Sequence, residues 1–334
     1  MRHLFLALLF CATLFGEKIL KIATYNVENL FDLQKSGHEY SEYIPNGSSL
    51  WNQKNYKIKL KNIAQVIKEI DADIIALQEV ESLQALLDLR FTLKQHGLYY
   101  QYYSIADKKD TTIKVALLSK IPFVYSKEVS VTQTLEYRNI LENKFVVNGK
   151  ELYVFVNHWK SKSGAESRRI ISAKALKKRV SEIGFEKNII LLGDFNSDYE
   201  EYIKFKRKRK HNDTDGITGI NHILGTINQR DRASKAEYAK DSFYNLWYDA
   251  DKESRYTYIY RGKKEVLDNI LISQPLLDQK GISYIHGTIS NFDKEYLFKK
   301  KSINRWEVSR AKVPKHKGKG YSDHLSVTAK FRVN

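Results

Sequence analysis

Apolar and polar positions alternate along this chain in short blocks rather than in long uniform segments. Eight runs rich in Val, Ile, Leu, Phe or Tyr have the length of β-strands. They cover residues 22–27, 74–78, 114–118, 144–147, 151–156, 189–192, 266–272 and 325–331. Asn148-Gly149 separates two of these runs, and this dipeptide predicts a tight hairpin between them.

Two further segments carry apolar residues at helical spacing. Residues 56–70 and 165–183 each place such residues on one face, for example Leu60 and Ile63 in the first. The simplest interpretation is that both helices cover a sheet. The chain has only four prolines and no internal repeat, so the sequence shows no Pro-rich linker that would separate two domains. The pattern favours one α/β domain over residues 17–334, with two packed sheets and helices outside.

The first sixteen residues have a pattern of their own. A charged start precedes an apolar run from Leu4 to Phe15, which is too short to span a bilayer and has the size of a secretory signal. We therefore expect residues 1–16 to be a signal peptide and the protein to be secreted or periplasmic. A buried N-terminal strand or helix is the alternative interpretation.

The cysteine content and the net charge limit the kinds of active site and partner that the protein can have. Cys11 is the one cysteine of the 334 residues and lies inside the predicted signal, so the mature chain would have no disulfide, thiolate metal site or cysteine nucleophile. The net charge of +17 becomes 17 − 1 = +16 when Arg2 is removed with the signal. Such a surplus points to a polyanionic partner, either nucleic acid or an anionic membrane.

Polar residues of catalytic type lie at the ends of several predicted strands, and Asp323 and His324 lie just before the last one. The full set is Asn26, Glu79, His158, Asp194, Asn196, Asp323 and His324. Strand ends are rigid and open onto one edge of a sheet, so these groups can converge there. Oxygen ligands suited to Mg²⁺, with Mn²⁺ or Ca²⁺ as alternatives, and two imidazoles for proton transfer are typical of metal-assisted phosphodiester hydrolysis.

The order of the motifs resembles that of the DNase I-like endonuclease/exonuclease/phosphatase superfamily, and secreted bacterial nucleases in particular. The motifs lie at 24–30 (Thr-Tyr-Asn-Val-Glu-Asn-Leu), 77–80 (Leu-Gln-Glu-Val), 157–162 (Asn-His-Trp-Lys-Ser-Lys), 193–197 (Gly-Asp-Phe-Asn-Ser), 267–270 (Leu-Asp-Asn-Ile) and 322–324 (Ser-Asp-His). The resemblance covers residues 20–330. It implies a four-layered α/β sandwich, in which two packed, mainly antiparallel sheets are flanked by helices and the site lies at one edge.

The resemblance also implies a role for each polar residue. Glu79 would be the main metal ligand, with Asn26 and Asp323 nearby. Asp194 and Asn196 would position the attacking water and the scissile phosphate.

The histidines complete the implied site. His324 would act with Asp268 as an acid/base pair, in which the carboxylate fixes the tautomer of the ring. His158 would contact phosphate or protonate the leaving oxygen.

One position departs from the animal nuclease, where a Glu that follows an Arg supports the histidine equivalent to His158. Here Arg138 is followed by Asn139, which leaves Glu136 or Glu142 as the candidate partner of that histidine. We interpret Arg138 itself as a phosphate contact.

Two basic stretches favour DNA as the substrate. Residues 204–210 hold six basic side chains in seven positions, and residues 294–319 hold ten Lys or Arg against two Glu. We expect the first stretch to hold the DNA backbone through Lys206, Arg207, Lys208 and Arg209. Tyr256, Tyr258, Tyr260 and Trp306 are candidates to stack on bases, although aromatic residues in strands also serve as core.

Two other functions remain open. A secreted sphingomyelinase or other phospholipid phosphodiesterase would need an exposed apolar hairpin to enter a bilayer, and the sequence has none, so we expect no stable membrane insertion. A catalytically inactive binding module would not need the complete set of polar residues. The sequence gives no indication of a protein partner.

Overall fold

The computed structural model describes residues 18–205, 211–227 and 240–334. The predicted signal and Lys206 to Arg209 lie outside these residues. A seven-stranded sheet has the order β13-β17-β1-β2-β4-β3, with β14 also paired to β17. Its strands are β1 (Lys18–Leu30), β2 (Ile74–Val80), β3 (Tyr102–Ile105), β4 (Lys114–Ser119), β13 (Ile282–Tyr284), β14 (Ser290–Asn291) and β17 (Val327–Val333).

A six-stranded sheet packs against the first and has the order β5-β6-β7-β8-β12-β9. Its strands are β5 (Phe123–Val129), β6 (Ile140–Val147), β7 (Lys150–His158), β8 (Ile189–Asp194), β9 (Tyr244–Asn245) and β12 (Asp268–Ile272). Within the described chain, β1 with β2 and β7 with β8 pair in parallel, and the remaining pairs of both sheets are antiparallel.

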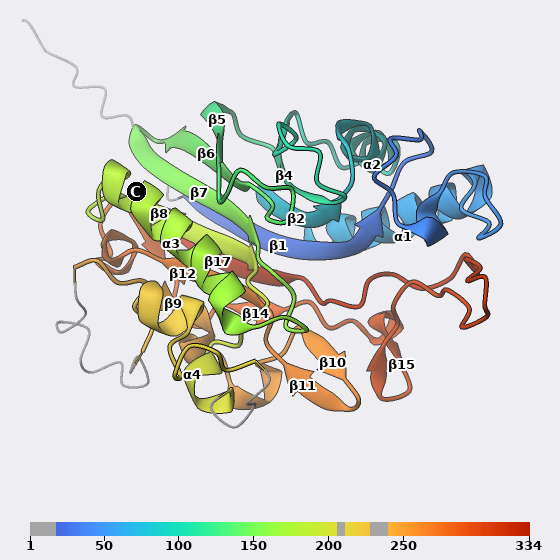
Figure 1. Cartoon of the computed structure of the whole chain (residues 1–334). Coiled ribbons are helices and arrows are strands. Elements are labelled where there is room, and N and C mark those ends of the chain that lie inside the picture. Colours follow the sequence, from blue (N-terminus) through green and yellow to red (C-terminus); the bar gives the residue numbers. More distant parts are fainter. Residues whose placement is uncertain (1–17, 206–210, 228–239) are drawn as a thin grey trace, which may run out of the picture.

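Helices cover both outer faces, so that the molecule has four layers (Figure 1). Helices α1 (Gln53–Ile70) and α2 (Leu83–Gln95) lie on the seven-stranded sheet, and α3 (Glu166–Ile183) lies on the six-stranded sheet. The predicted four-layered sandwich is confirmed.

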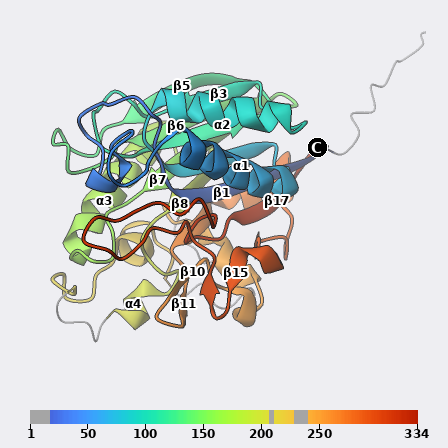
Figure 2. The same ribbon diagram turned by 90° about the vertical axis from the view of Figure 1, so that its right-hand side faces the viewer.

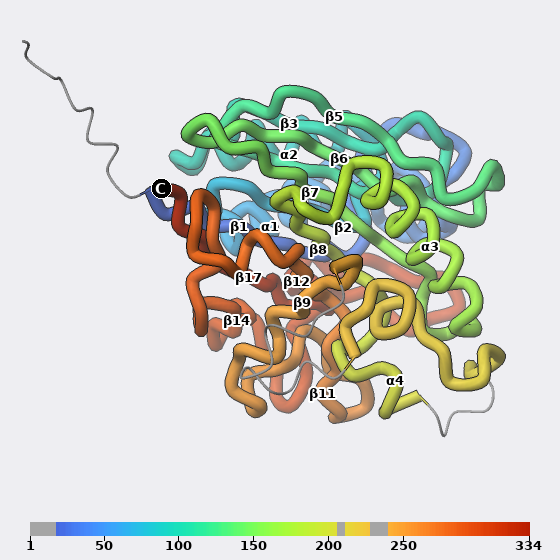
Figure 3. The backbone as a smooth tube through the Cα atoms, turned by 90° about the vertical axis from the view of Figure 1, so that its left-hand side faces the viewer, coloured from blue at the N-terminus to red at the C-terminus, as the bar shows by residue number. Residues whose placement is uncertain are grey.

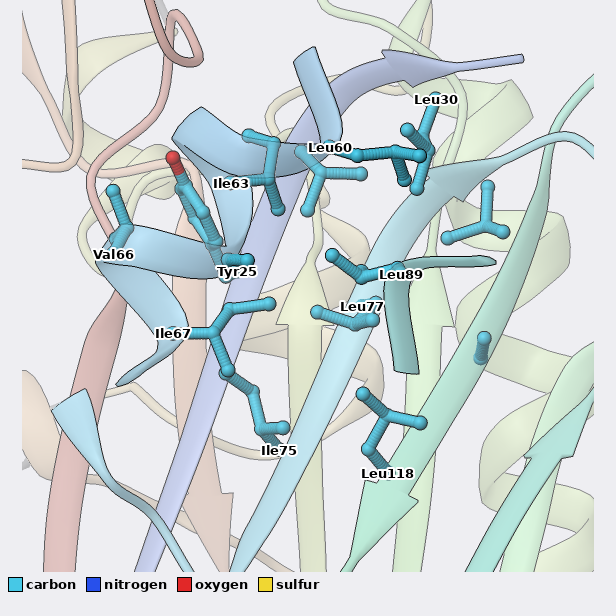
Figure 4. Packing of buried hydrophobic residues seen from close by; sticks show 14 of the residues in the cluster. Tyr25, Leu30, Leu60, Ile63, Val66, Ile67, Ile75, Leu77, Leu89 and Leu118 are labelled. Atoms are coloured by element: carbon cyan, nitrogen blue, oxygen red, sulfur yellow. The ribbon is translucent and has the colours of Figure 1, made fainter. Parts of the chain in front are cut away.

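Burial on both faces explains why the strands read as continuous apolar runs. Successive residues of a strand point to opposite faces. In β2, Ile74 therefore joins the core between the sheets, whereas Ile75 packs under α1. Figure 4 shows this second core, in which Ile63 and Ile67 of α1 lie over Ile75 and other strand residues.

All eight predicted strands and both predicted helices are present. The hairpin between β6 and β7 is also confirmed, because Asn148 and Gly149 have φ of 49° and 72°, the left-handed conformation that such a turn requires. Helix α1 begins at Gln53, three residues before the predicted start, because the Asn52 side chain caps it by accepting from the N–H groups of Lys54 and Asn55.

Smaller elements surround the sandwich. Two hairpins, β10 (Tyr258–Tyr260) with β11 (Lys263–Glu265) and β15 (Phe298–Lys299) with β16 (Ser302–Ile303), project together from its lower end (Figure 2). The others are α4 (Glu201–Lys204) and the short helices η1 (Ser41–Tyr43), η2 (Gly219–Ile223), η4 (Leu246–Asp249), η5 (Lys252–Ser254), η6 (Gln274–Leu277) and η7 (Glu295–Leu297).

The last strand runs beside the first. Val333 of β17 pairs with Lys18 of β1, so the end of the chain lies next to the first described strand (Figure 3). None of the helices among the described residues is long and apolar enough to cross a membrane.

Candidate active site

Strand register brings polar side chains of both sheets to one edge. His158 at the end of β7 lies opposite Asp194 at the end of β8, and Asp268 at the start of β12 lies opposite Asp194 from the other side. A cleft of about 570 Å³ opens at this edge. Its lining includes Glu79, Arg138, His158, Asp194, Asn196, Asp323 and His324.

Asn26 joins the two sheets beneath the cleft. Its side-chain amide donates to Glu79 Oε1 at 3.0 Å and to Asp194 Oδ2 at 3.1 Å, and the residue is fully buried. The predicted convergence of these three residues is therefore confirmed.

Glu79 sits in an irregularity of its strand. The pairing of β2 shifts between Gln78 and Val80, and Glu79 takes the left-handed conformation with φ of 66°. The N–H of Asn29 donates to Glu79 Oε2 at 2.9 Å. This bulge turns the carboxylate into the cleft, and such bulges are frequent next to active sites.

The electrostatics of Glu79 fit a divalent cation. Burial raises the pKa of its carboxyl group, and the negative charge of Asp323 raises that pKa further. A cation between these two carboxylates would offset both effects. Because the donors around the cleft are carboxylate and amide oxygens, the residues suit a hard metal such as Mg²⁺.

Asp194 is placed to handle a proton. Burial raises the pKa of its carboxyl group to about 7, against the lowering effect of the charge on His324. Its Oδ1 accepts from the N–H of Asn196 at 2.8 Å, and Asn196 in turn donates to the carbonyl of Trp159 at 3.3 Å. A carboxylate with this pKa exchanges protons near neutral pH.

His324 and Asp268 form the predicted pair. Nδ1 of His324 lies 2.7 Å from Asp268 Oδ2. Burial alone would favour the neutral ring, but the charge of Asp268 and this hydrogen bond raise the pKa of His324 well above its ordinary value. Ligand atoms of Asp194, Asp268 and His324 lie within 4.8 Å of one another and could also hold a cation. We favour the hydrogen-bonded pair, because a protonated ring cannot bind a metal.

His158, in contrast, is held neutral. Burial lowers its pKa well below the ordinary value, and the positive charge of Arg138 lowers it further. Its Nε2 lies 3.5 Å from Asp194 Oδ2 and 3.9 Å from Glu79 Oε1. The cleft thus holds one charged and one neutral imidazole.

Neither Glu136 nor Glu142 supports His158, so this expectation is wrong. The carboxylate of Glu136 pairs with Arg168 at 3.0 Å, and that of Glu142 is bound by Arg179. Nδ1 of His158 is buried and has no hydrogen-bond partner among the described residues.

Sequence reasoning missed a charged brace beneath the cleft. The ammonium of Lys59, which is 0% exposed, donates to the carbonyls of Glu28 at 2.8 Å and Tyr321 at 3.0 Å. Arg305 binds the Glu28 carboxylate through two nitrogens and lies 3.2 Å from Asp323. A signal was present, because Lys59 occupies a position in the apolar stripe of α1.

The structure divides the four aromatic candidates for base stacking. Trp306 and Tyr256 are 2% and 7% exposed, so the stacking interpretation is wrong for them, and both belong to the core under α1. Tyr258 and Tyr260 line the cleft. Arg138 also lines it, with one nitrogen 3.4 Å from the carbonyl of Trp159, and its contact with phosphate stays a prediction.

Comparison with known proteins agrees with this geometry. A sequence profile described as "Endonuclease/Exonuclease/phosphatase family" matches residues 21–332. No curated protein sequence matches the chain significantly.

Several solved structures share the fold. An endonuclease/exonuclease/phosphatase family protein from Bacteroides thetaiotaomicron has a TM-score of 0.56 at 16% identity, over 96% of this chain and 100% of that one. A mannosyl-6-phosphatase from the same species gives 0.54 at 16%, over 93% and 99%. D. rerio TDP2 complexed with single-strand DNA product gives 0.57 at 14%, over 94% and 98%. At these identities the likeness establishes the fold and leaves the substrate open.

Proposed function

Because the chain belongs to the endonuclease/exonuclease/phosphatase family, whose members hydrolyse phosphate esters with a divalent metal ion, we propose that it is an exported, Mg²⁺-dependent nuclease that cleaves DNA with little sequence preference. The observation that carries the hydrolytic part is the meeting of Asp194 with one protonated and one neutral imidazole in one cleft. Groups whose pKa values are pushed apart are typical of acid/base pairs.

In the proposed reaction, water attacks the phosphorus and the bond to the leaving oxygen breaks. Asp194 accepts the proton of the water, and Asn196 holds the phosphate beside it. His324, kept protonated by Asp268, donates a proton to the leaving oxygen, so that protons balance without a covalent intermediate. The neutral His158 donates a hydrogen bond to a phosphate oxygen.

Glu79, Asn26 and Asp323 would hold the metal. When bound, the cation supplies charge stabilisation for the phosphate in the transition state. Arg138 at the rim adds a fixed positive charge on the same side as His158.

Charge supports a nucleic acid as the substrate. The net charge of +17 suits a long polyanion better than a small phosphate ester. The similar D. rerio TDP2 was solved with a single-strand DNA product, so this fold can accept DNA. Export is proposed from the apolar segment at residues 4–15 alone.

A substrate panel tests the proposal. Supercoiled plasmid, sphingomyelin vesicles, a phosphoinositide and mannose 6-phosphate are incubated with the purified protein and Mg²⁺, each with and without EDTA. We expect EDTA-sensitive nicking of the plasmid at the highest kcat/KM of the panel. Faster turnover of a lipid or sugar phosphate would replace DNA as the substrate, and EDTA-resistant nicking would contradict the role of the metal.

A further inference from the structure

The β10–β11 hairpin presents one face to the cleft and the other to the core. Its register pairs Tyr258 with Glu265 and Tyr260 with Lys263. Side chains two residues apart lie on the same face of a strand. Tyr258, Tyr260 and Glu265 accordingly all line the cleft, whereas the intervening Ile259 packs against the core under α1.

The two tyrosine rings therefore lie one after the other along the strand, with Tyr258 next to the catalytic histidine. Tyr258 forms a backbone bridge with His324, and its ring centroid lies 5.0 Å from that of the imidazole. Tyr260 lies two residues further out, which in a strand is about 7 Å. At this distance Tyr260 would contact the part of the substrate next to the reacting phosphate.

Tyr260 has no packing role that would explain an aromatic residue. It is 51% exposed, and within the described chain the only cation or ring that packs on it is the guanidinium of Arg261, 5.3 Å from its centroid. Lys263, also exposed, pairs with Tyr260 and lies on the same face of the hairpin, whereas the ammonium of Lys264 lies over the ring of Tyr256. An exposed ring among basic side chains is the arrangement with which proteins bind single-stranded nucleic acid, where the ring stacks on a base and the cations follow the backbone.

We propose that the cleft face of the β10–β11 hairpin is a stacking platform for the base next to the scissile phosphate. Bases of a duplex already stack on each other, whereas those of a single strand or frayed end are free to stack on a protein ring. The enzyme therefore prefers single-stranded or frayed DNA over intact duplex. This inference rests on the proposed nuclease function and adds the form of DNA that the site accepts.

The test compares two single-stranded oligonucleotides that differ at one nucleotide beside the labelled cleavage position. One carries a base there and the other an abasic tetrahydrofuran residue. For the wild-type protein we expect kcat/KM to be about tenfold higher with the base, mainly through KM, because stacking contributes to binding. In Tyr260→Leu this ratio falls towards one, and Tyr260→Trp restores it.

A second readout does not depend on turnover. An oligonucleotide with 2-aminopurine at the same nucleotide is mixed with metal-free protein in EDTA, and stacking on the tyrosine quenches its fluorescence. We expect quenching with wild-type protein and its loss in Tyr260→Leu. The control is Tyr99→Leu, since Tyr99 is similarly exposed at 46% and does not line the cleft.

The outcomes separate this inference from the proposed function. Cleavage of both oligonucleotides at one rate, with no quenching, overturns the stacking platform and leaves the nuclease in place. Failure to cleave either one while another phosphate ester is hydrolysed overturns the nuclease function itself. Equal losses in the Tyr99 and Tyr260 variants would assign the effect to stability and also overturn the platform.

Discussion

The two histidines of the cleft differ in charge because their neighbours differ. Asp268 stands behind His324, whereas Arg138 and the low-dielectric interior act on His158. In the proposed reaction the protonated His324 can then donate a proton to the leaving oxygen, while the neutral His158 donates a hydrogen bond to phosphate.

We expect His324→Ala to lower kcat on DNA by about a hundredfold or more, the usual size of acid/base catalysis. We expect His158→Ala to cost about as much, the usual effect of removing a hydrogen-bond donor to the charge of the transition state. Steady-state kinetics with circular dichroism as a folding control measures this. A harmless His158→Ala would show that the ring, which has no second hydrogen-bond partner among the described residues, is not held for catalysis.

At Glu79 we expect the negative charge of the carboxylate to decide the proposed metal binding. Glu79→Gln keeps the size of the side chain and its bond to the N–H of Asn29, so the fold should persist. We expect most Mg²⁺-dependent activity to be lost, together with the heat of Mg²⁺ binding in calorimetry. Near wild-type turnover in Glu79→Gln would remove this residue from the metal site.

The residues that meet at the cleft could be predicted from the sequence because each belongs to a short motif at the end of a strand or beside one. The place of Lys59 in the apolar stripe of α1 indicated its burial, but its partners could not be predicted. They are backbone carbonyls of two segments distant in the chain, and a carbonyl leaves no trace in the sequence. The partner of His158 was predicted wrongly for a similar reason, since a Glu near in sequence can find a stronger ion pair in the fold.

Among the elements, α1 carries the brace that fixes two site segments. Lys59 holds the segment after Asn26 and the one before Asp323 through their carbonyls. Lys59→Met leaves both carbonyls and the Glu28 carboxylate without this cation. We expect Mg²⁺ affinity, measured by calorimetry, to fall about 10- to 100-fold, the usual effect of a residue that orients a ligand.

Two variants of α1 control for stability. Lys59→Arg keeps the charge and should recover most of the affinity, while Lys61→Met removes an exposed lysine of the same helix and should change nothing. If Lys59→Met lowers the melting temperature but leaves the Mg²⁺ affinity intact, the brace serves stability alone.

The loop of residues 304–321 is fastened by His316. The Trp306 indole donates to His316 Nδ1 at 2.8 Å, and His316 Nε2 donates to the carbonyl of Glu42 at 2.8 Å, which assigns the neutral tautomer. Burial lowers the pKa of His316, the nearby Lys59 charge lowers it further, and the Glu42 contact acts against both.

A pH dependence of stability follows. Because the folded pKa lies below the unfolded value of about 6.5, the unfolded chain binds the proton first, and the contribution of His316 is complete above that pH and lost below it. We expect the difference in melting temperature between wild type and His316→Gln to shrink from pH 7.5 to 5.5. A constant difference would show that the ring does not titrate on unfolding.

Strands could be predicted from the sequence where both faces are buried, but not where buried and exposed residues are mixed. Strands β1, β2 and β8 are buried on both faces, and their sequences show it. Strands β3 and β5 lie at sheet edges with partly exposed residues, and the hairpins β10–β11 and β15–β16 have strands of two or three residues. Such segments carry no period that separates them from loops.

At the scale of the whole molecule, we expect charge to govern the proposed association with DNA. Each Lys or Arg that neutralises a phosphate releases counterions, so binding should fall log-linearly with salt, with a slope near −0.9 per contact on duplex DNA. Replacing Lys206, Arg207, Lys208 and Arg209 by Ser should flatten that slope. Fluorescence anisotropy at increasing salt measures it, and an unaltered slope would mean that these four residues do not touch the backbone.

The position of β17 has a consequence for how the protein is made. This strand lies between β13 and β1, inside the seven-stranded sheet, and His324 directly precedes it. Because β1 pairs with a strand about three hundred residues later in the chain, this pairing and the contact between His324 and Asp268 can form only after nearly all of the described chain has been synthesised.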